Sequence, residues 1–133
     1  MHRGCPFCEI VNNDPLHRIV AQNELAFIVR DGFPVSEGHT LIIPKRHVAS
    51  FFEITSEERE SLFALLDSEK KVLDKELNPD AYNIGINDGV AAGQTVSHLH
   101  IHLIPRFRGD VDDPRGGIRW IKPEKAVYWS EDT

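Results

Sequence analysis

The chain has 133 residues, of which 41% are hydrophobic and 27% charged, and its formal net charge is −6. This length suits one domain with a sizeable core, the composition excludes a disordered chain, and the negative charge argues against general binding to nucleic-acid polymers. No apolar run approaches the roughly 20 residues that cross a bilayer, and the start MHRGCPFCEI lacks the apolar segment of a signal peptide. We therefore expect a cytoplasmic protein that does not associate with membranes.

The first third of the chain predicts a short helix and three strands. The helix starts with a Cys-Pro turn and ends near Asn12 and Asn13. The segments with strand composition are 17–23, 24–31 and 39–44. A turn at Gln22-Asn23 separates the first two strands, and Pro44 ends the third.

The clearest helix signal covers residues 54–77. Thr55 is a suitable N-cap, and Glu58, three residues later, completes a capping box. Pro79 follows the end of the segment. The aliphatic residues expected to form the buried stripe of this helix are Leu62, Leu65, Leu66, Val72, Leu73 and Leu77.

Two further strands follow the long helix, at 81–87 and 95–105, with a glycine-rich turn over 88–94 between them. Strands joined by short loops, with the long helix inserted before the last pair, indicate an α+β fold. We expect a five-stranded antiparallel sheet with one long and one short helix. The segment 109–129 is too rich in glycine and proline for regular structure, although its aromatic residues imply that it packs on something.

Three histidines alternate with large aliphatic residues in SHLHIHLIPR, residues 97–106. On a strand, His98, His100 and His102 share one face, with ring attachments about 6.6 Å apart. At this spacing two neighbouring rings can bind one metal ion or one phosphate, whereas three rings are too far apart to reach a single atom easily. The pattern admits a solvated strand face, a metal site built from two of the histidines, or phosphoryl or nucleotidyl transfer by an imidazole nucleophile. Histidine is a poor choice for a merely solvated face, which disfavours the first interpretation.

Cys5 and Cys8 form a Cys-x-x-Cys pair. In a cytoplasmic protein such a pair is more often metal-binding or redox-active than disulfide-bonded. A redox motif of this kind lies between a strand and a helix, and no strand is predicted before Cys5. The pair therefore favours a metal site.

The segment GQTVSHLHIHLIPR (93–106) resembles the signature of the histidine-triad (HIT) family, His-φ-His-φ-His-φ-φ with φ hydrophobic, and residues 98–104 fill it completely. NDGVAAGQT and GHTLIIPKRH resemble further family segments in their usual order and spacing. The resemblance covers about residues 5–106, which we take as the core of a single HIT domain (1–133) with an irregular tail (107–133). It implies a nucleotide-binding hydrolase or transferase that is usually a homodimer.

The resemblance also implies a role for each matched position. His100 would attack the α-phosphorus and form a nucleotidyl-histidine, His102 would contact the same phosphate, and His39 would support the triad from an adjacent strand. Asp31 would bind both ribose hydroxyls. The positions that would line the base slot, the phosphate and the leaving-group side are Phe7, Ile10, Val29, Asn87, Gly93, Gln94 and Thr95. For the three apolar residues, plain core packing is at least as good an explanation.

Some members of the family, especially bacterial ones, hold a structural zinc ion with two cysteines and two histidines, and the matching residues here are Cys5, Cys8, His47 and His98. His98 would then face zinc, which leaves His100 and His102 for phosphate. Among the family's substrates we expect an AMP- or GMP-containing dinucleoside polyphosphate, cleaved at the α-phosphate. The alternatives are a nucleoside phosphoramidate hydrolase, a nucleotidyltransferase, or a non-catalytic nucleotide sensor.

Overall fold

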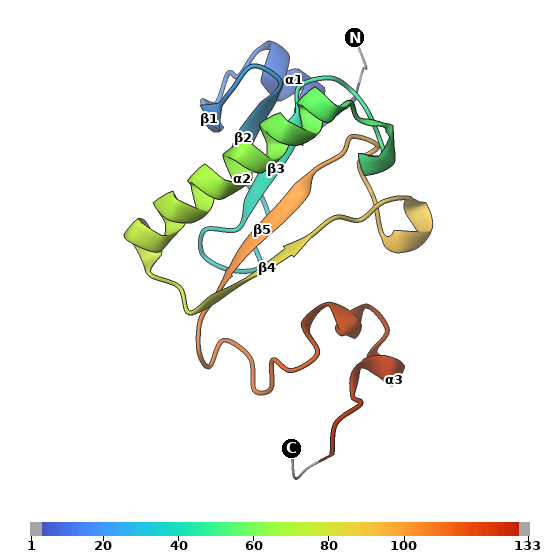
Figure 1. Ribbon diagram of the computed structural model, residues 1–133. Coiled ribbons are helices and arrows are strands. Elements are labelled where there is room, and N and C mark those ends of the chain that lie inside the picture. The colour runs from blue at the N-terminus through green and yellow to red at the C-terminus, as the bar shows by residue number, and fades with distance from the viewer. Residues whose placement is uncertain (1–3, 131–133) are drawn as a thin grey trace.

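The computed structural model describes residues 4–130, so the ends of the expected domain, 1–3 and 131–133, lie outside the described residues. The helices are α1 (Pro6–Asn12), α2 (Ser56–Leu77) and α3 (Pro123–Ala126), with 3-10 turns η1 (Phe51–Glu53), η2 (Val90–Ala92) and η3 (Gly117–Ile121). The strands are β1 (Ile19–Gln22), β2 (Ala26–Arg30), β3 (Thr40–Pro44), β4 (Ala81–Gly85) and β5 (Ile101–Arg106). They form one antiparallel five-stranded sheet in the order β1-β2-β3-β5-β4, and α2 lies across one of its faces (Figure 1). The predicted α+β fold is confirmed.

Helix α2 starts with the predicted capping box. The backbone amide of Glu58 donates to the Thr55 hydroxyl at 3.0 Å, and the Thr55 amide donates to the Glu58 carboxylate at 2.9 Å. These bonds satisfy amide groups that a helix start otherwise leaves unpaired. The last turn ends at Asn78, whose left-handed backbone (φ 48°) stops the helix one residue before Pro79.

The buried stripe of α2 differs from the predicted one: two glutamates belong to it, Val72 does not, and Leu66 and Leu77 are only partly buried against the core. The buried residues, spaced three or four apart, are Glu58, Leu62, Leu65, Glu69 and Leu73. The two glutamates are ionic residues at core-facing positions, and each carboxylate is paired with an arginine: Arg46 for Glu58 and Arg30 for Glu69. Val72, expected in the stripe, is 39% exposed because it lies beside that line and not on it.

The sheet carries a hydrophobic core on each face. Alternate residues of β2 and β3 point to opposite sides. Those on the α2 side pack in a cluster with Leu62, Leu65 and Leu73, and those on the α1 side pack with Phe7 and Ile10. Burial on both faces explains why these two central strands are almost uniformly apolar.

The predicted strand over 95–105 is wrong at its start. Strand β5 begins only at Ile101, where residues 101–103 pair with Thr40–Ile42 of β3. The chain before it bends away, and the Leu99 amide donates to the Val48 carbonyl at 2.7 Å outside the sheet ladder. Of the three alternating histidines, only His102 therefore belongs to a strand. The β4 strand likewise ends at Gly85, two residues earlier than expected.

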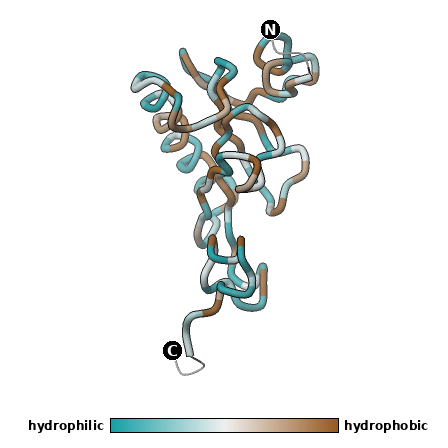
Figure 2. Tube along the Cα trace, turned by 90° about the vertical axis from the view of Figure 1, so that its right-hand side faces the viewer, coloured by the Kyte–Doolittle hydropathy of each residue, from teal (hydrophilic) through white to brown (hydrophobic). Residues whose placement is uncertain are grey.

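The C-terminal segment contains two short helical turns, η3 and α3, where the sequence predicted none. Figure 2 shows it reaching away from the sheet with hydrophobic and hydrophilic stretches intermixed. Its aromatic residues are braced by arginines, with Arg115 over the Trp129 ring and Arg119 over the Tyr128 ring, at 4.6 and 4.7 Å from the ring centroids. Within residues 4–130, no helix combines the length and the apolar character needed to cross a membrane.

Candidate active site

His100 has one ring nitrogen committed to the backbone. Its Nδ1 lies 2.8 Å from the carbonyl oxygen of His98. A carbonyl only accepts, so Nδ1 carries the proton and the lone pair of Nε2 is left free. The ring is half-buried and lies beside that of His102, with centroids 5.1 Å apart. The local backbone thus selects the Nδ1–H tautomer of the neutral ring, in which Nε2 has the free lone pair that a nucleophile needs.

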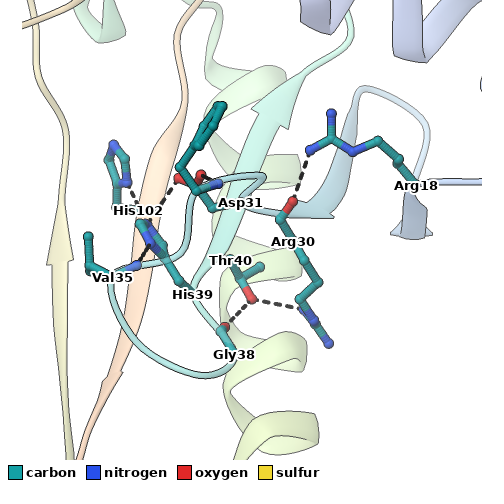
Figure 3. Close-up of polar contacts among 9 residues, drawn as sticks. Arg18, Arg30, Asp31, Val35, Gly38, His39, Thr40 and His102 are labelled. Carbon is teal, nitrogen blue, oxygen red and sulfur yellow. Dashed lines mark hydrogen bonds and ion pairs between the residues drawn. The ribbon is translucent and has the colours of Figure 1, made fainter. Parts of the chain in front are cut away.

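A chain of hydrogen bonds fixes the other two histidines of the site (Figure 3). The Val35 amide donates to Nδ1 of His39 at 3.2 Å, so in neutral His39 the proton sits on Nε2. That nitrogen lies 2.9 Å from Nδ1 of His102 and 3.4 Å from Oδ2 of Asp31. When His39 donates to His102, the proton of His102 is on its own Nε2. His102 then offers an N–H donor beside the free lone pair of His100.

The electrostatics of the site keep these imidazoles neutral. The pKa of His102 is lowered to about 4, first by burial and then by the neighbouring His100 and His39, while Asp31 opposes the shift. Burial also lowers the pKa of His39, again against the attraction of Asp31. At neutral pH, His102 is therefore a hydrogen-bond donor without a positive charge.

Asp31 joins the triad to the loop between β2 and β3. Its Oδ1 accepts the Phe33 amide at 2.7 Å, while Oδ2 faces His39. The same loop is tied to β5 by the Ser36 hydroxyl, which donates to the Pro105 carbonyl at 2.6 Å. The carboxylate is 17% exposed and retains lone pairs for further donors.

The glycine-rich turn over 88–94 is braced from inside. Nε2 of Gln94 donates to the carbonyls of Ala49 and Val96, and its Oε1 accepts the Gly89 amide. Gln94, expected to contact phosphate, therefore uses its side chain to shape the turn in this structure. The turn is further held by Asp88, whose Oδ2 accepts the Ser50 hydroxyl and the Phe51 amide, both at 3.0 Å. Sequence reasoning missed both bracing roles, because the partners Ala49, Ser50 and Phe51 are distant in the chain.

The remaining predicted nucleotide-site residues fall into an exposed and a buried group. Asn87, Gly93 and Thr95 are exposed around the turn, and Gly93 has a positive φ of 97°, where a residue without Cβ is favoured. The apolar residues expected to line the base slot, Phe7, Ile10 and Val29, are all buried in the core cluster on the α1 side.

A second group of side chains could hold a metal ion. The ligand atoms of Cys5, Cys8, His47 and His98 all lie within 4.8 Å of one another. The sulfur of Cys8 is 3.2 Å from Nδ1 of His47 and 3.6 Å from Nδ1 of His98, and the sulfur of Cys5 is 3.4 Å from Nδ1 of His98. In tetrahedral zinc sites the bond lengths place sulfur and nitrogen ligands about 3.6 Å apart, so this donor set fits zinc closely.

The hydrogen bonds around the cluster also suit a metal. Nε2 of His98 donates to the Pro44 carbonyl at 2.8 Å, which leaves Nδ1 as the lone-pair nitrogen that faces the two sulfurs. All four predicted ligands are thus brought together from α1, the loop after β3 and the segment before β5. By contrast, Asp31, His39 and His102 also come within 4.8 Å, but there two ring nitrogens face each other at hydrogen-bond distance.

Comparisons with known proteins agree with these features. The sequence model of the HIT domain matches residues 14–109. The adenosine 5′-monophosphoramidase hnt1 of Schizosaccharomyces pombe is 36% identical over 97% of this chain and 95% of its own. The asymmetrical bis(5′-nucleosyl)-tetraphosphatase of the same yeast is 42% identical over 60% of this chain but only 44% of its own length. A zinc-bound histidine triad family protein from Mycobacterium smegmatis has a similar crystal structure, with a TM-score of 0.73 and 32% identity over 92% of this chain and 94% of its own.

Proposed function

The chain belongs to the HIT domain family, and on that basis we propose that it is an enzyme that cleaves a nucleoside phosphate conjugate at the α-phosphorus through a nucleotidyl-histidine intermediate. The observation that carries this proposal is the bond from Nδ1 of His100 to the His98 carbonyl, which frees Nε2 for attack. Covalent catalysis of this kind splits one difficult displacement into two easier ones.

In the first step, Nε2 of His100 forms a bond to the α-phosphorus while the bond to the leaving group breaks. The leaving group takes the electron pair of that bond. His102 would donate its Nε2–H to a non-bridging oxygen of the same phosphate, where negative charge grows in the transition state. Its low pKa keeps His102 in the neutral form, whose protonation pattern is set by His39.

In the second step, water attacks the phosphorus of the nucleotidyl-histidine from the side that the leaving group has vacated. The bond to Nε2 breaks, His100 regains its lone pair, one proton of the water passes to solvent, and the nucleoside monophosphate leaves. The turn over 88–94, with Gly93 and Thr95 exposed at its end, would supply backbone amide and hydroxyl donors to the phosphate oxygens, and Asn87 would contact the leaving side. Gln94 would act on this step by holding the turn in shape.

The nucleoside would lie between Asp31 and the α1 side of the sheet. The Asp31 carboxylate would accept both ribose hydroxyls, and the apolar surface of Phe7, Ile10 and Val29 would form the wall against the base. Each of these three residues is at most 7% exposed, so a bound base would meet their edges and not their full faces.

We propose a dinucleoside polyphosphate as the substrate, supported by the likeness to the yeast tetraphosphatase and by the Gln-Thr and Pro-Arg pairs that flank the triad. A nucleoside phosphoramidate is the second candidate, since the likeness to the monophosphoramidase spans nearly the whole of both chains. Turnover of diadenosine tetraphosphate and of adenosine 5′-phosphoramidate, measured side by side on one preparation, distinguishes the two.

The experiment that tests the mechanism is acid quenching during turnover of a labelled substrate. We expect phosphoramidate-linked nucleotide on the peptide that contains His100, and a loss of several orders of magnitude in turnover for His100→Ala with AMP affinity largely retained. His102→Asn should cost less. An active His100→Ala enzyme, or label on another residue, would refute the assignment.

Zinc held by Cys5, Cys8, His47 and His98 would have a structural role in this scheme. Two thiolates and two imidazoles close a tetrahedral site, so the ion would tie α1 to the sheet without reaching the substrate. We also propose that the protein is a homodimer that pairs through α2 and a sheet edge. The edge strand β4 exposes Ile84, and light scattering of the purified chain would test the assembly.

A further inference from the structure

The four metal-ligand residues are connected to the ring of His100 by two separate contacts. One contact runs through the backbone of His98, and the other runs through Phe7, which lies between the two cysteines in the sequence. Neither contact involves the substrate. Both depend on how the cluster holds its own residues.

The first contact is the bond from Nδ1 of His100 to the His98 carbonyl. His98 has no exposed surface, and its ring is fixed from two sides. Nε2 donates to the Pro44 carbonyl, and Nδ1 faces the sulfurs of Cys5 and Cys8. A residue clamped in this way holds its carbonyl in one direction, and that direction decides which nitrogen of His100 carries the proton.

The second contact is made by the Phe7 ring. Its centroid lies 5.6 Å from that of His98, edge to face, and 5.1 Å from that of His100. Phe7 is 7% exposed, so the ring has little freedom of its own. It belongs to α1, a helix of only 7 residues, which is far too short to be stable alone. The ring is therefore held against the nucleophile by its packing in the core cluster on this side of the sheet and by the two cysteines at the first turn of α1.

We propose that the Cys5-Cys8-His47-His98 cluster, with its metal bound, is the device that positions the nucleophile: His98 fixes the tautomer of His100 and Phe7 fixes the plane of its ring. His98 and Phe7 are thus positioning residues for the reaction, and occupancy of the cluster controls the rate although no metal ligand contacts the phosphate. The proposal rests on the proposed function only in taking His100 as the nucleophile.

The first test compares the full-length protein loaded with zinc, stripped with a chelator, and reloaded. Nitrogen-15 NMR of the histidine rings reports the tautomer of His100 without any substrate. We expect a single Nδ1–H tautomer in the loaded protein, a mixture of tautomers in the stripped one, and recovery on reloading. In the stripped protein, kcat should fall by roughly tenfold or more, which is the scale for loss of one positioned hydrogen bond. Reloading with zinc should restore kcat.

The second test uses Phe7→Leu, which stays apolar and leaves the metal ligands in place. We expect full zinc content, broadened His100 signals and a lower kcat. Leu62→Ala is the matched control, since Leu62 is buried in the core cluster on the opposite face of the sheet from Phe7. This variant should lower stability and leave kcat unchanged. Phe7→Leu also decides the question if the stripped protein unfolds.

A stripped, folded protein with the same tautomer and kcat as the loaded one would overturn the inference. So would a Phe7→Leu enzyme with a raised KM and an unchanged kcat, because that result would make Phe7 a base-slot residue alone. Failure of the proposed function has a different signature, namely retained activity in His100→Ala whatever the tautomer of the wild-type ring.

Discussion

Replacing Asp31 by alanine should weaken AMP binding by about 1.5–3 kcal/mol, which is the scale of hydrogen bonds to a charged group. In the structure, Oδ1 already accepts the Phe33 amide and Oδ2 faces His39. Each oxygen keeps one further acceptor position, so the carboxylate can take both hydroxyls of a cis-diol. The loss corresponds to a dissociation constant roughly 10- to 150-fold higher, which isothermal titration calorimetry resolves readily.

The matched ligand and the matched variant separate ribose binding from loop support. AMP with both ribose hydroxyls removed has no partner for Asp31, so its affinity should change by less than about threefold in Asp31→Ala. Asp31→Asn retains an acceptor for the Phe33 amide, so it should keep the loop in place while losing the charge. We expect its AMP affinity to fall between those of the wild type and the alanine variant.

Equal losses for AMP and for its dideoxy form would refute this reasoning. Such a result would mean that Asp31 acts by holding the loop or by orienting His39, whose Nε2 lies 3.4 Å from the carboxylate. A second contradiction would be an Asp31→Asn variant as weak as Asp31→Ala for both ligands.

Three further predictions concern stability and metal content. The pKa of His102 is about 4 in the folded protein against its usual 6.5. Between these two values the unfolded chain binds a proton that the folded protein does not, so stability falls as the pH decreases from 6.5 to 4. In His102→Asn the melting temperature should therefore change less between pH 7 and 5 than in the wild type. Leu73 is buried on α2, so Leu73→Ala should lower the free energy of unfolding in urea by about 2–4 kcal/mol. Val72, its neighbour, is exposed, so Val72→Ala should lower that free energy by less than about 1 kcal/mol. Metal analysis should find about one zinc per chain, and clearly less in Cys8→Ser together with a lower melting temperature.

The sequence determined the features that depend on neighbouring residues. The capping box of Thr55 and Glu58 needs only residues three apart, and it formed as predicted. The strands β2 and β3 followed from short apolar runs ended by a turn and by Pro44, and the α+β order of elements followed from these segments. The spacing of Cys5 and Cys8 by itself indicated a metal site, and the resemblance to the HIT family supplied His47 and His98 as the two further ligands that meet them.

The tertiary structure alone decided what depends on partners distant in the chain. Two glutamates, Glu58 and Glu69, can occupy buried positions of α2 because each carboxylate is paired with an arginine from another part of the chain. No local sequence pattern predicts these pairs, which involve Arg46 and Arg30. Strand β5 starts late because the chain before it bends away from β3 and the Leu99 amide bonds to the distant Val48 carbonyl. The protonation of the triad depends on backbone groups of Val35, His98 and Pro44, which every residue carries and no sequence motif marks. Side-chain chemistry can be read from residue identity, but the direction of a carbonyl or an amide is fixed only when the chain has folded around it.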